Sequence, residues 1–452
     1  MKTKLGQGFL VASLVSVLWL SFIGESQALP TFARKHKTSC TTCHTATPCL
    51  NAFGEAYRIN GYKMPDLATK EEPVVLMQEA YAKADLEKRS ALFPSTLPAT
   101  PPISVRLLLD YVVDQGGEQA VASDFNYLHE TEVMVAGSLG DKFAFFGEIE
   151  FEREAGAMET ATEGWFQVED LFLKENLMNV KIGNLEVAMP YASSHHRLTK
   201  THYLYGDWRM PKVGGKRNDW RMRKVQPGLE INGFQEYWHY AVGFVNGNAS
   251  NEDSNTFKDQ YILFRYKLGG MKYTESGTAG EVKPEEGYQI CRDKSVQLGA
   301  FYYRGKAEVN NREDGFYRLG FDVHATQGKV IGSAGYIKGS HHNPWGRTGN
   351  EAIDSTDTFV ELEYAFYPWL IGQLRYESLD WKELSDADML AMGITDQDKT
   401  RLITGASALL ANNVRLLVEL SRAITDDTLT EVTPEKDKNE NDRLFVRLDF
   451  SF

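Results

Sequence analysis

The chain is poor in cysteine, in positive charge and in long apolar runs, and each shortage excludes a class of protein. Four cysteines in 452 residues cannot form the dense disulfide framework of a small secreted scaffold. Lys and Arg number 49 against 62 Asp and Glu, a formal charge of -13, which disfavours nucleic acid as a partner because duplex binding requires a basic surface. The mean hydropathy of -0.38 is too low for a polytopic helical membrane protein. A transmembrane β-barrel is still allowed, because its strands alternate apolar and polar residues.

One apolar run does stand at the N-terminus. Two lysines precede an apolar stretch from Phe9 to Ile23, and residues 26–28 (Ser-Gln-Ala) place small side chains where a signal peptidase cuts. The stretch is shorter than the roughly 20 residues of a membrane-spanning helix. We therefore predict a secretory signal peptide over residues 1–28 rather than a membrane anchor. The mature chain would enter a compartment that permits disulfides.

A short motif after the signal predicts a haem. Cys40, Cys43 and His44 form Cys-x-x-Cys-His, the pattern of c-type haem attachment. The two thiols can form thioethers to one porphyrin, and the adjacent imidazole can bind its iron. A redox dithiol or half of a zinc site is the alternative, but no second Cys-x-x-Cys or nearby His pair completes a zinc set. We predict one covalent haem c with His44 as proximal ligand.

The ligand on the other face of the iron is not specified by the motif. Met64 follows in Gly-Tyr-Lys-Met-Pro, and a thioether there would raise the reduction potential relative to a second imidazole. Met77 and His36 are rivals, and each of these side chains also has an ordinary role in packing or solvation. Met64 is kept as the candidate distal ligand, with the alternatives open.

The haem segment, residues 29–66, is too short to build a core of its own. Because it must also shield a large apolar macrocycle, we expect it to pack against another part of the chain. Residues 67–102 have a different texture. The stretch from Pro73 to Phe93 predicts a helix that begins at a proline, and the four prolines after it predict a stiff linker. A periplasmic helix and a plug inside the lumen both remain open.

Residues 103–452 are built of short segments with a period of two. In residues 143–152 the apolar set comprises Phe143, Phe145, Ile149 and Phe151, and the opposite set comprises Phe146, Glu148, Glu150 and Glu152. This period, with charges on one face, indicates strands between an apolar and an aqueous environment. Candidate strands lie at 103–113, 127–139, 142–153, 165–174, 177–186, 226–233, 237–246, 257–268, 294–305, 314–326, 329–338, 356–366, 369–381, 400–411, 414–424 and 443–452. This even number predicts an all-β fold, a 16-stranded outer-membrane β-barrel.

The connections between these segments support a porin-like barrel. Tight turns are expected at Leu139-Gly140-Asp141, Gln327-Gly328-Lys329, Tyr367-Pro368 and Asn412-Asn413, with long polar loops between them, the longest at about 187–225. Short periplasmic turns and long outer loops are typical of porin-like barrels. The last strand ends on Phe452, which resembles the terminal aromatic recognised in outer-membrane barrels. A soluble sandwich or propeller would not need apolar rows on every strand.

These residues together resemble a known family. The matching elements are Ala33-Arg34, the Cys40–His44 motif, Pro48-x-Leu50, Phe53-Gly54 and Gly61-Tyr62, followed by a sixteen-stranded porin. They are similar to the fused monohaem cytochrome c–porin family, whose members include outer-membrane iron oxidases of iron-oxidising bacteria. The likeness covers about residues 30 to 62, and the barrel matches in architecture only. Tyr57 stands where the family pattern has Phe, and Cys49 lies inside the Pro-x-Leu element.

The resemblance implies an outer-membrane electron-transfer protein. Electrons would pass from an extracellular donor, foremost Fe²⁺, through the single haem to a periplasmic c-type cytochrome or cupredoxin. If Fe²⁺ is the donor, the activity would be iron:cytochrome c oxidoreductase-like. A transport porin with a sensing or gating haem module is the alternative, as is outward electron flow to an extracellular acceptor.

Other residues allow weaker expectations. A Cys49–Cys291 disulfide would tie the haem segment to the barrel wall, with two separate thiols as the alternative. The pairs His195-His196 and His341-His342 fall in predicted outer loops, where they would either collect metal or, as we favour, reflect polar loop composition. Inward-facing glutamates would make a negative lumen that concentrates cations; they are Glu148, Glu150, Glu152, Glu361 and Glu363.

Overall fold

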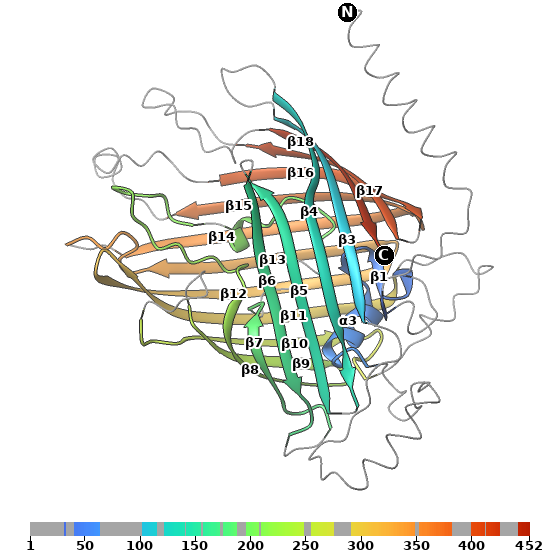
Figure 1. Ribbon diagram of the computed structural model, residues 1–452, viewed down its shortest axis with the longest axis horizontal. Coiled ribbons are helices and arrows are strands. Elements are labelled where there is room, and N and C mark those ends of the chain that lie inside the picture. Colours follow the sequence, from blue (N-terminus) through green and yellow to red (C-terminus); the bar gives the residue numbers. More distant parts are fainter. Residues whose placement is uncertain are drawn as a thin grey trace, which may run out of the picture.

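The protein is described by a computed structural model of the 452-residue chain, and sixteen antiparallel strands close into a barrel (Figure 1). The described residues are 31–32, 40–63, 102–114, 122–140, 142–154, 157–171, 175–187, 196–207, 209–247, 255–274, 291–348, 352–381, 399–411, 413–424 and 442–452. The predicted signal peptide, the Pro73–Phe93 helix and the ligand candidates Met64, Met77 and His36 lie outside them. The predicted fold class, an all-β 16-stranded barrel, is confirmed.

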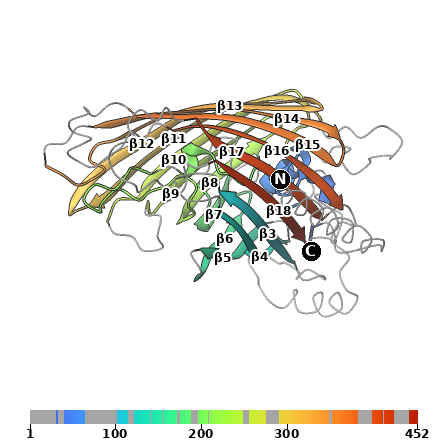
Figure 2. The same ribbon diagram turned by 90° about the horizontal axis from the view of Figure 1, so that it is seen from above.

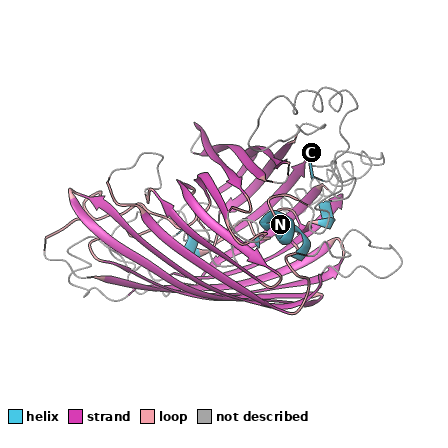
Figure 3. Ribbon diagram, turned by 90° about the horizontal axis from the view of Figure 1, so that it is seen from below, coloured by secondary structure: helices cyan, strands magenta, loops and turns pink. Residues whose placement is uncertain are grey.

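Each strand pairs with its neighbours in the sequence, and β18 pairs with β3 to close the barrel. The strands are β3 (Ile103–Asp114), β4 (Ala122–Leu139), β5 (Phe143–Glu154), β6 (Ala157–Val168), β7 (Asn179–Leu185), β8 (Gln226–Gln235), β9 (Trp238–Val245), β10 (Asp259–Leu268), β11 (Cys291–Val309), β12 (Arg312–Gly328), β13 (Val330–His341), β14 (Ile353–Tyr367), β15 (Leu370–Trp381), β16 (Lys399–Ala411), β17 (Val414–Ala423) and β18 (Arg443–Ser451). Strands predominate throughout the described chain (Figures 2 and 3).

Two details differ from the sequence prediction. The strand expected at 165–174 is β6, which runs over Ala157–Val168 and is followed by Asp170 in the left-handed region with φ 55°. The connection between β11 and β12 is only Asn310-Asn311, although it lies at the end of the barrel where long loops were expected. Both asparagines have positive φ, the requirement of a two-residue type I′ hairpin turn. Long and short connections therefore do not segregate completely between the two ends.

The barrel is apolar outside and charged inside. On β10 the outward side chains Ile262 and Phe264 are 48% and 46% exposed, whereas the inward Arg265 and Lys267 are 4% and 1% exposed. This arrangement reverses that of a soluble protein and suits a barrel whose outer wall meets lipid. Among the described helices, none is long and apolar enough to cross a membrane.

The N-terminal segment in which the sequence predicts a haem, still called the haem segment here, lies at the end of the barrel where β3 begins and β18 ends (Figure 1, blue). It contains the 3₁₀ turn η1 (Cys40–Thr42), the strands β1 (His44–Ala46) and β2 (Cys49–Leu50), and the helix α3 (Ala52–Ile59). We call this the turn end of the barrel, because it also carries the tight turns at Gly140 and Gly328, both with positive φ.

The connection between β7 and β8 folds into the lumen instead of extending outward. Its described part, residues 196–207 and 209–225, is called the plug loop and contains the short helix α5 (Leu204–Asp207). Leu198 and Met210 are each 1% exposed, and Met222 is fully buried. The expectation of a long polar outer loop at this position is therefore wrong, because the loop buries apolar side chains inside the barrel.

Candidate functional site

The Cys-x-x-Cys-His motif forms a compact turn. The Cys43 amide donates to the carbonyl oxygen of Cys40 at 3.2 Å, which draws the two cysteines onto one turn. His44 follows at the start of β1, and its Nδ1 lies 3.1 Å from the Pro48 carbonyl oxygen. With Nδ1–H donating to that carbonyl, the ring carries its lone pair on Nε2. A backbone acceptor of this kind is the usual support of a metal-binding imidazole.

Helix α3 is fastened directly to this turn. Asn51 caps the helix by accepting from the Gly54 amide at 3.0 Å, and its own side chain donates to the Thr42 carbonyl at 3.0 Å. The Asn51 amide donates to the Cys43 carbonyl at 2.9 Å. A Cβ on Gly54 would overlap with that same carbonyl, so glycine is required for the close approach. The Phe53-Gly54 element thus has a packing role beneath the motif.

Aromatic stacking holds the end of the haem segment against the barrel wall. Tyr62 is 8% exposed, and its ring stacks on Phe32 with centroids 4.8 Å apart and on Trp165 of β6 at 6.0 Å. Gly61 and Tyr62 both have positive φ, and a Cβ on Gly61 would meet the side chain of Ala144 on β5. The Gly61-Tyr62 element therefore turns the chain so that the tyrosine ring reaches the wall.

Polar contacts fix the same helix to two further parts of the barrel. Glu55 is 4% exposed and accepts from Gln297 Nε2 of β11 at 3.0 Å, with Arg265 Nη1 of β10 at 3.9 Å. On the other side Arg58 pairs with Glu186 at 3.1 Å. The haem segment therefore packs on the inner wall, as its short length requires.

A cavity of about 450 Å³ opens beside the motif. Cys40, Cys43 and His44 line it together with inward side chains of β3 to β6, of β17 and β18, and of the plug loop. Its volume lies within the range of roughly 300–1,000 Å³ found for small-molecule and cofactor sites. The donor set, the supported imidazole and the adjoining cavity fit a covalently attached haem.

Burial sets the protonation of the two cysteines. It raises the pKa of the Cys40 thiol to about 11, and with a smaller contribution from Cys40 it raises that of Cys43 to about 12. Burial therefore disfavours the thiolate, which is the reactive form in thiol–disulfide exchange. An uncharged thioether suits this setting.

The lumen is not uniformly negative. Seven glutamates line the cavity, and Glu148 lies directly opposite Glu163 across β5 and β6. Eight Lys and Arg side chains line it as well, and Arg106 pairs with Glu132 at 2.8 Å. The predicted inward positions of Glu148, Glu150 and Glu152 are confirmed. The expected negative lumen is corrected, because the acidic wall of β4 to β6 faces basic side chains from β3, β17, β18 and the plug loop.

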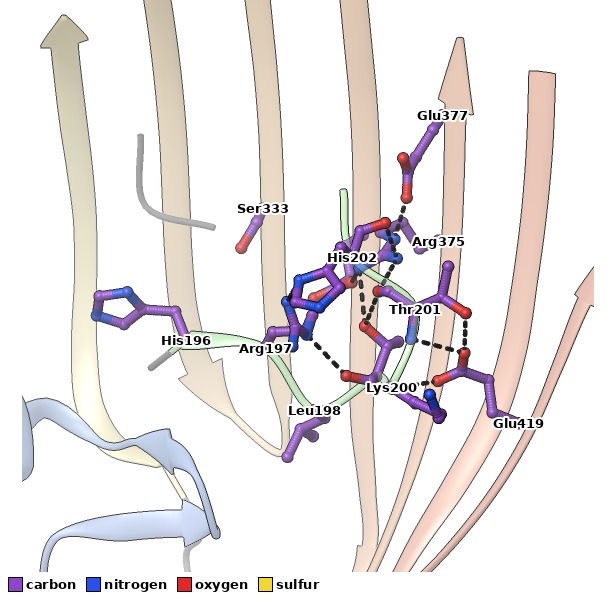
Figure 4. Close-up of polar contacts among 12 residues, drawn as sticks. His196, Arg197, Leu198, Lys200, Thr201, His202, Ser333, Arg375, Glu377 and Glu419 are labelled. Atoms are coloured by element: carbon purple, nitrogen blue, oxygen red, sulfur yellow. Dashed lines mark hydrogen bonds and ion pairs between the residues drawn. The ribbon is translucent and has the colours of Figure 1, made fainter. Parts of the chain in front are cut away.

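Hydrogen bonds to buried charged side chains of the barrel wall hold the plug loop in place (Figure 4). Arg375 of β15 has no exposed surface, and its guanidinium donates to Thr199 Oγ1 at 2.8 Å and to the Thr201 carbonyl at 2.6 Å. Its carboxylate partners are Glu377 and Glu361, the latter at 3.4 Å. Glu361 and Glu363 do face inward, at 4% and 3% exposure, but Glu361 serves this network instead of an open channel.

Of the predicted outer-loop histidines, His196 and His341 are buried, whereas His342 is exposed. His196 is 7% exposed and lies in the lumen near Glu55, with Nε2 and Oε1 3.9 Å apart; His195 lies outside the described residues. His341 ends β13 at 3% exposure, and its Nδ1 lies 2.8 Å from Asp314 Oδ2. Within the part of the chain that the structure describes, no group of three or more His, Cys, Asp and Glu side chains is arranged to hold a metal ion. The external metal-collecting interpretation therefore has no support there.

Cys49 joins the haem segment to the plug loop. Its Sγ lies 3.4 Å from the His196 carbonyl oxygen, and its side chain is 5% exposed. The backbone of Cys291 begins β11, but its side chain is outside the described residues. The disulfide between them stays a prediction.

Sequence reasoning missed the plug loop as part of the site. Its residues Arg197, Thr199, Lys200, His202 and Tyr203 line the cavity opposite the motif. One signal was present in the sequence: the supposed outer loop carries apolar and aromatic residues, which a solvated loop does not need. The apolar residues of the loop have no regular period, so its course through the lumen could not be predicted from the sequence.

Comparison with known proteins identifies the fold. No family model matches the chain, and no curated protein matches it as a relative. Among solved structures, OmpF of Salmonella typhi in complex with daunomycin is 12% identical with a TM-score of 0.50, covering 77% of this chain and 97% of that one. An anion-selective porin from Comamonas acidovorans is 10% identical, also with a TM-score of 0.50, covering 77% and 98%. At these identities the likeness shows a porin-type barrel.

Proposed function

We propose that this chain is an outer-membrane electron-transfer protein that holds one haem c on Cys40, Cys43 and His44. Electrons from an extracellular donor, foremost Fe²⁺, would enter this haem and leave to a periplasmic c-type cytochrome or cupredoxin. The observation that carries the proposal is the position of the motif. It lies inside one end of a porin-type barrel and faces a cavity in the lumen.

The outer membrane is the environment that the barrel suits best. The export signal expected at residues 1–28, the apolar outer wall and the porin-type fold all favour it. A haem in the periplasm alone could react only with donors that cross this membrane. A haem held inside the barrel meets a donor that stays outside, including one that forms insoluble products when it is oxidised.

The residues of the chain would hold, orient and shield the group. Haem supplies a one-electron change of iron valence, and the protein sets its location, ligands and electric field. Cys40 and Cys43 would hold the porphyrin, and the Pro48 carbonyl would keep the His44 ring oriented. Tyr57 and Tyr62, which line the cavity, would exclude water.

The test is electron entry from one side of a membrane. Oxidised, haem-loaded protein is reconstituted in liposomes without oxygen, Fe²⁺ is added outside, and the reduced haem band is followed by stopped flow. The proposal expects Fe²⁺ to reduce the haem when the outer end of the barrel faces the added Fe²⁺. Reduction should be later in sealed liposomes that carry the barrel in the reverse orientation. Ready reduction by dithionite with none by Fe²⁺ would contradict Fe²⁺ as the donor.

A transport porin with a gating or sensing haem is the second candidate, because the barrel shares its fold with porins. It requires an ion-conducting lumen, which planar-bilayer recordings measure, and no fast oxidation of an external donor. Outward electron flow is separated by the reverse experiment. A reduced haem that loses its electron to an external ferric mineral would support that direction.

A further inference from the structure

Met134 is an unusual residue on the inner wall of the barrel. It lies on β4, whose outward neighbour Val135 is 37% exposed, whereas Glu132 on the inward row is 6% exposed. Met134 shares this inward row with Glu132 and Ala136, and it lines the cavity beside the motif. The cavity-lining face of the adjacent strand carries Glu148 and Glu150. A thioether among carboxylates satisfies none of their charges, so its presence there needs another reason.

Three neighbours of Met134 touch the haem segment. Ser104, directly opposite on β3, accepts from the Thr31 amide at 2.9 Å. Ala136, two residues along the same row, belongs to the cluster of Phe53, Tyr57 and Tyr62, against which Cys43 packs. Phe146, opposite Ala136 on β5, stacks on Tyr62 with centroids 6.4 Å apart.

These contacts place Met134 at the edge of the haem segment. Neighbouring strands lie about 4.8 Å apart, and residues two apart on a strand lie roughly 7 Å apart. Met134 is therefore about one side chain away from surfaces that already touch the segment. It lies on the side of Ala136 toward Glu132, where the row continues along the cavity.

Few other side chains of the barrel and plug loop could bind haem iron from this cavity. Among the described residues that line it outside the haem segment, the remaining nitrogen donors suited to the role are His202, Lys200 and Lys224, and a lysine must first lose its proton. His202 Nδ1 lies 2.5 Å from Arg197 Nη1, so it accepts from that guanidinium and carries its proton on Nε2. Lys200 pairs with Asp110 at 3.6 Å and lies over the Phe445 ring. Met134 has no proton to lose and no ion pair to break.

We propose that Met134 is the sixth ligand of the haem iron, supplied by the barrel wall. This inference rests on the haem c of the proposed function. A thioether opposite His44 raises the reduction potential relative to two imidazoles. The potential would then depend on the haem segment being docked in the barrel, because the two axial ligands come from different parts of the fold.

The test compares methionine variants of the full-length, haem-loaded barrel. Met134→Leu should lose the methionine–iron charge-transfer absorption and become high-spin by electron paramagnetic resonance. Met222→Leu, at a buried lumenal methionine in a separate cluster, is the matched control and should keep both signals. Met134→His should show the low-spin spectrum of two imidazoles with a lowered potential, a gain of signal that misfolding cannot produce.

Three results would overturn the inference. One is loss of the methionine–iron band in Met64→Leu with an unchanged Met134→Leu spectrum, which would assign the ligand to the haem segment. Another is a wild-type spectrum in both variants. The third is wild-type protein that carries no covalent haem, which would overturn the proposed function as well. In the first two cases haem is still attached, so failure of the Met134 assignment is distinguishable from failure of the proposed function.

Discussion

Removal of the Tyr62 ring should release the haem segment from the barrel. The ring is 8% exposed and stacks on Phe32 and Trp165. Truncation of a buried large aromatic side chain to alanine costs about 3–5 kcal/mol. Since 1.4 kcal/mol is a factor of ten, Tyr62→Ala should reduce the ratio of docked to undocked segment by roughly 100-fold to a few thousand-fold. The barrel strands should stay folded, because the hydrogen bonds that pair β5 with β6 do not involve Tyr62.

Hydrogen exchange measures this change directly. The Tyr62 amide donates to the Tyr57 carbonyl at 2.9 Å, and the Asn60 amide donates to that of Ala56 at 3.0 Å. Protection at the end of α3 should fall in Tyr62→Ala while protection in the strands persists. Tyr266→Ala, at an outward tyrosine that is 42% exposed, is the control. Unchanged protection of α3 would refute the docking described here.

Three further predictions concern the motif and the plug loop. Gly54→Ala should lower the yield of haem attachment seen by haem staining of denatured protein, because its Cβ overlaps with the Cys43 carbonyl; overpacking of this kind costs about 1–3 kcal/mol. Arg375→Gln should raise single-channel conductance, because it removes the guanidinium that donates to Thr199 and Thr201 of the plug loop. Hydrogen bonds to a charged group contribute about 1.5–3 kcal/mol each, and unchanged conductance would contradict that role. Burial, with the Arg197 charge second, holds the pKa of His202 well below its ordinary 6.5. His202 would therefore bind a proton below pH 6.5 in the undocked plug loop but stay neutral in the docked one. Docking should weaken by up to about 1.4 kcal/mol per pH unit below 6.5, and conductance should rise on acidification in the wild type but not in His202→Gln.

The barrel could be predicted because its physics is local. A strand with one face in lipid and one toward the lumen must alternate, and Phe143 to Glu152 show this period without any knowledge of their partners. The start of β6 was missed because its own residues lack this alternation. Apart from Met158, its residues from Ala157 to Gly164 are small or polar on both faces, so pairing with β5 rather than its own pattern makes this part a strand.

The Cys-x-x-Cys-His motif could be recognised in the sequence for a different reason. Cys40, Cys43 and His44 are close in sequence, as the haem-attachment pattern requires of residues that would share one porphyrin. The plug loop has no such constraint. Its position depends on Arg375, Glu377 and Glu419, which belong to strands far along the chain. The proposed role of Met134 could not be found from the sequence either, because only the folded barrel brings β4 beside the haem segment.

The measurement that tests the account most directly is the mass of the protein under denaturing conditions. The protein is produced in cells that attach c-type haem, and wild type is compared with the Cys40→Ala/Cys43→Ala double variant. The account predicts that wild type retains one haem, located on the peptide that contains Cys40 and Cys43, and that the variant retains none. Wild-type protein with the mass of the bare polypeptide, in cells that load another c-type cytochrome, would contradict it.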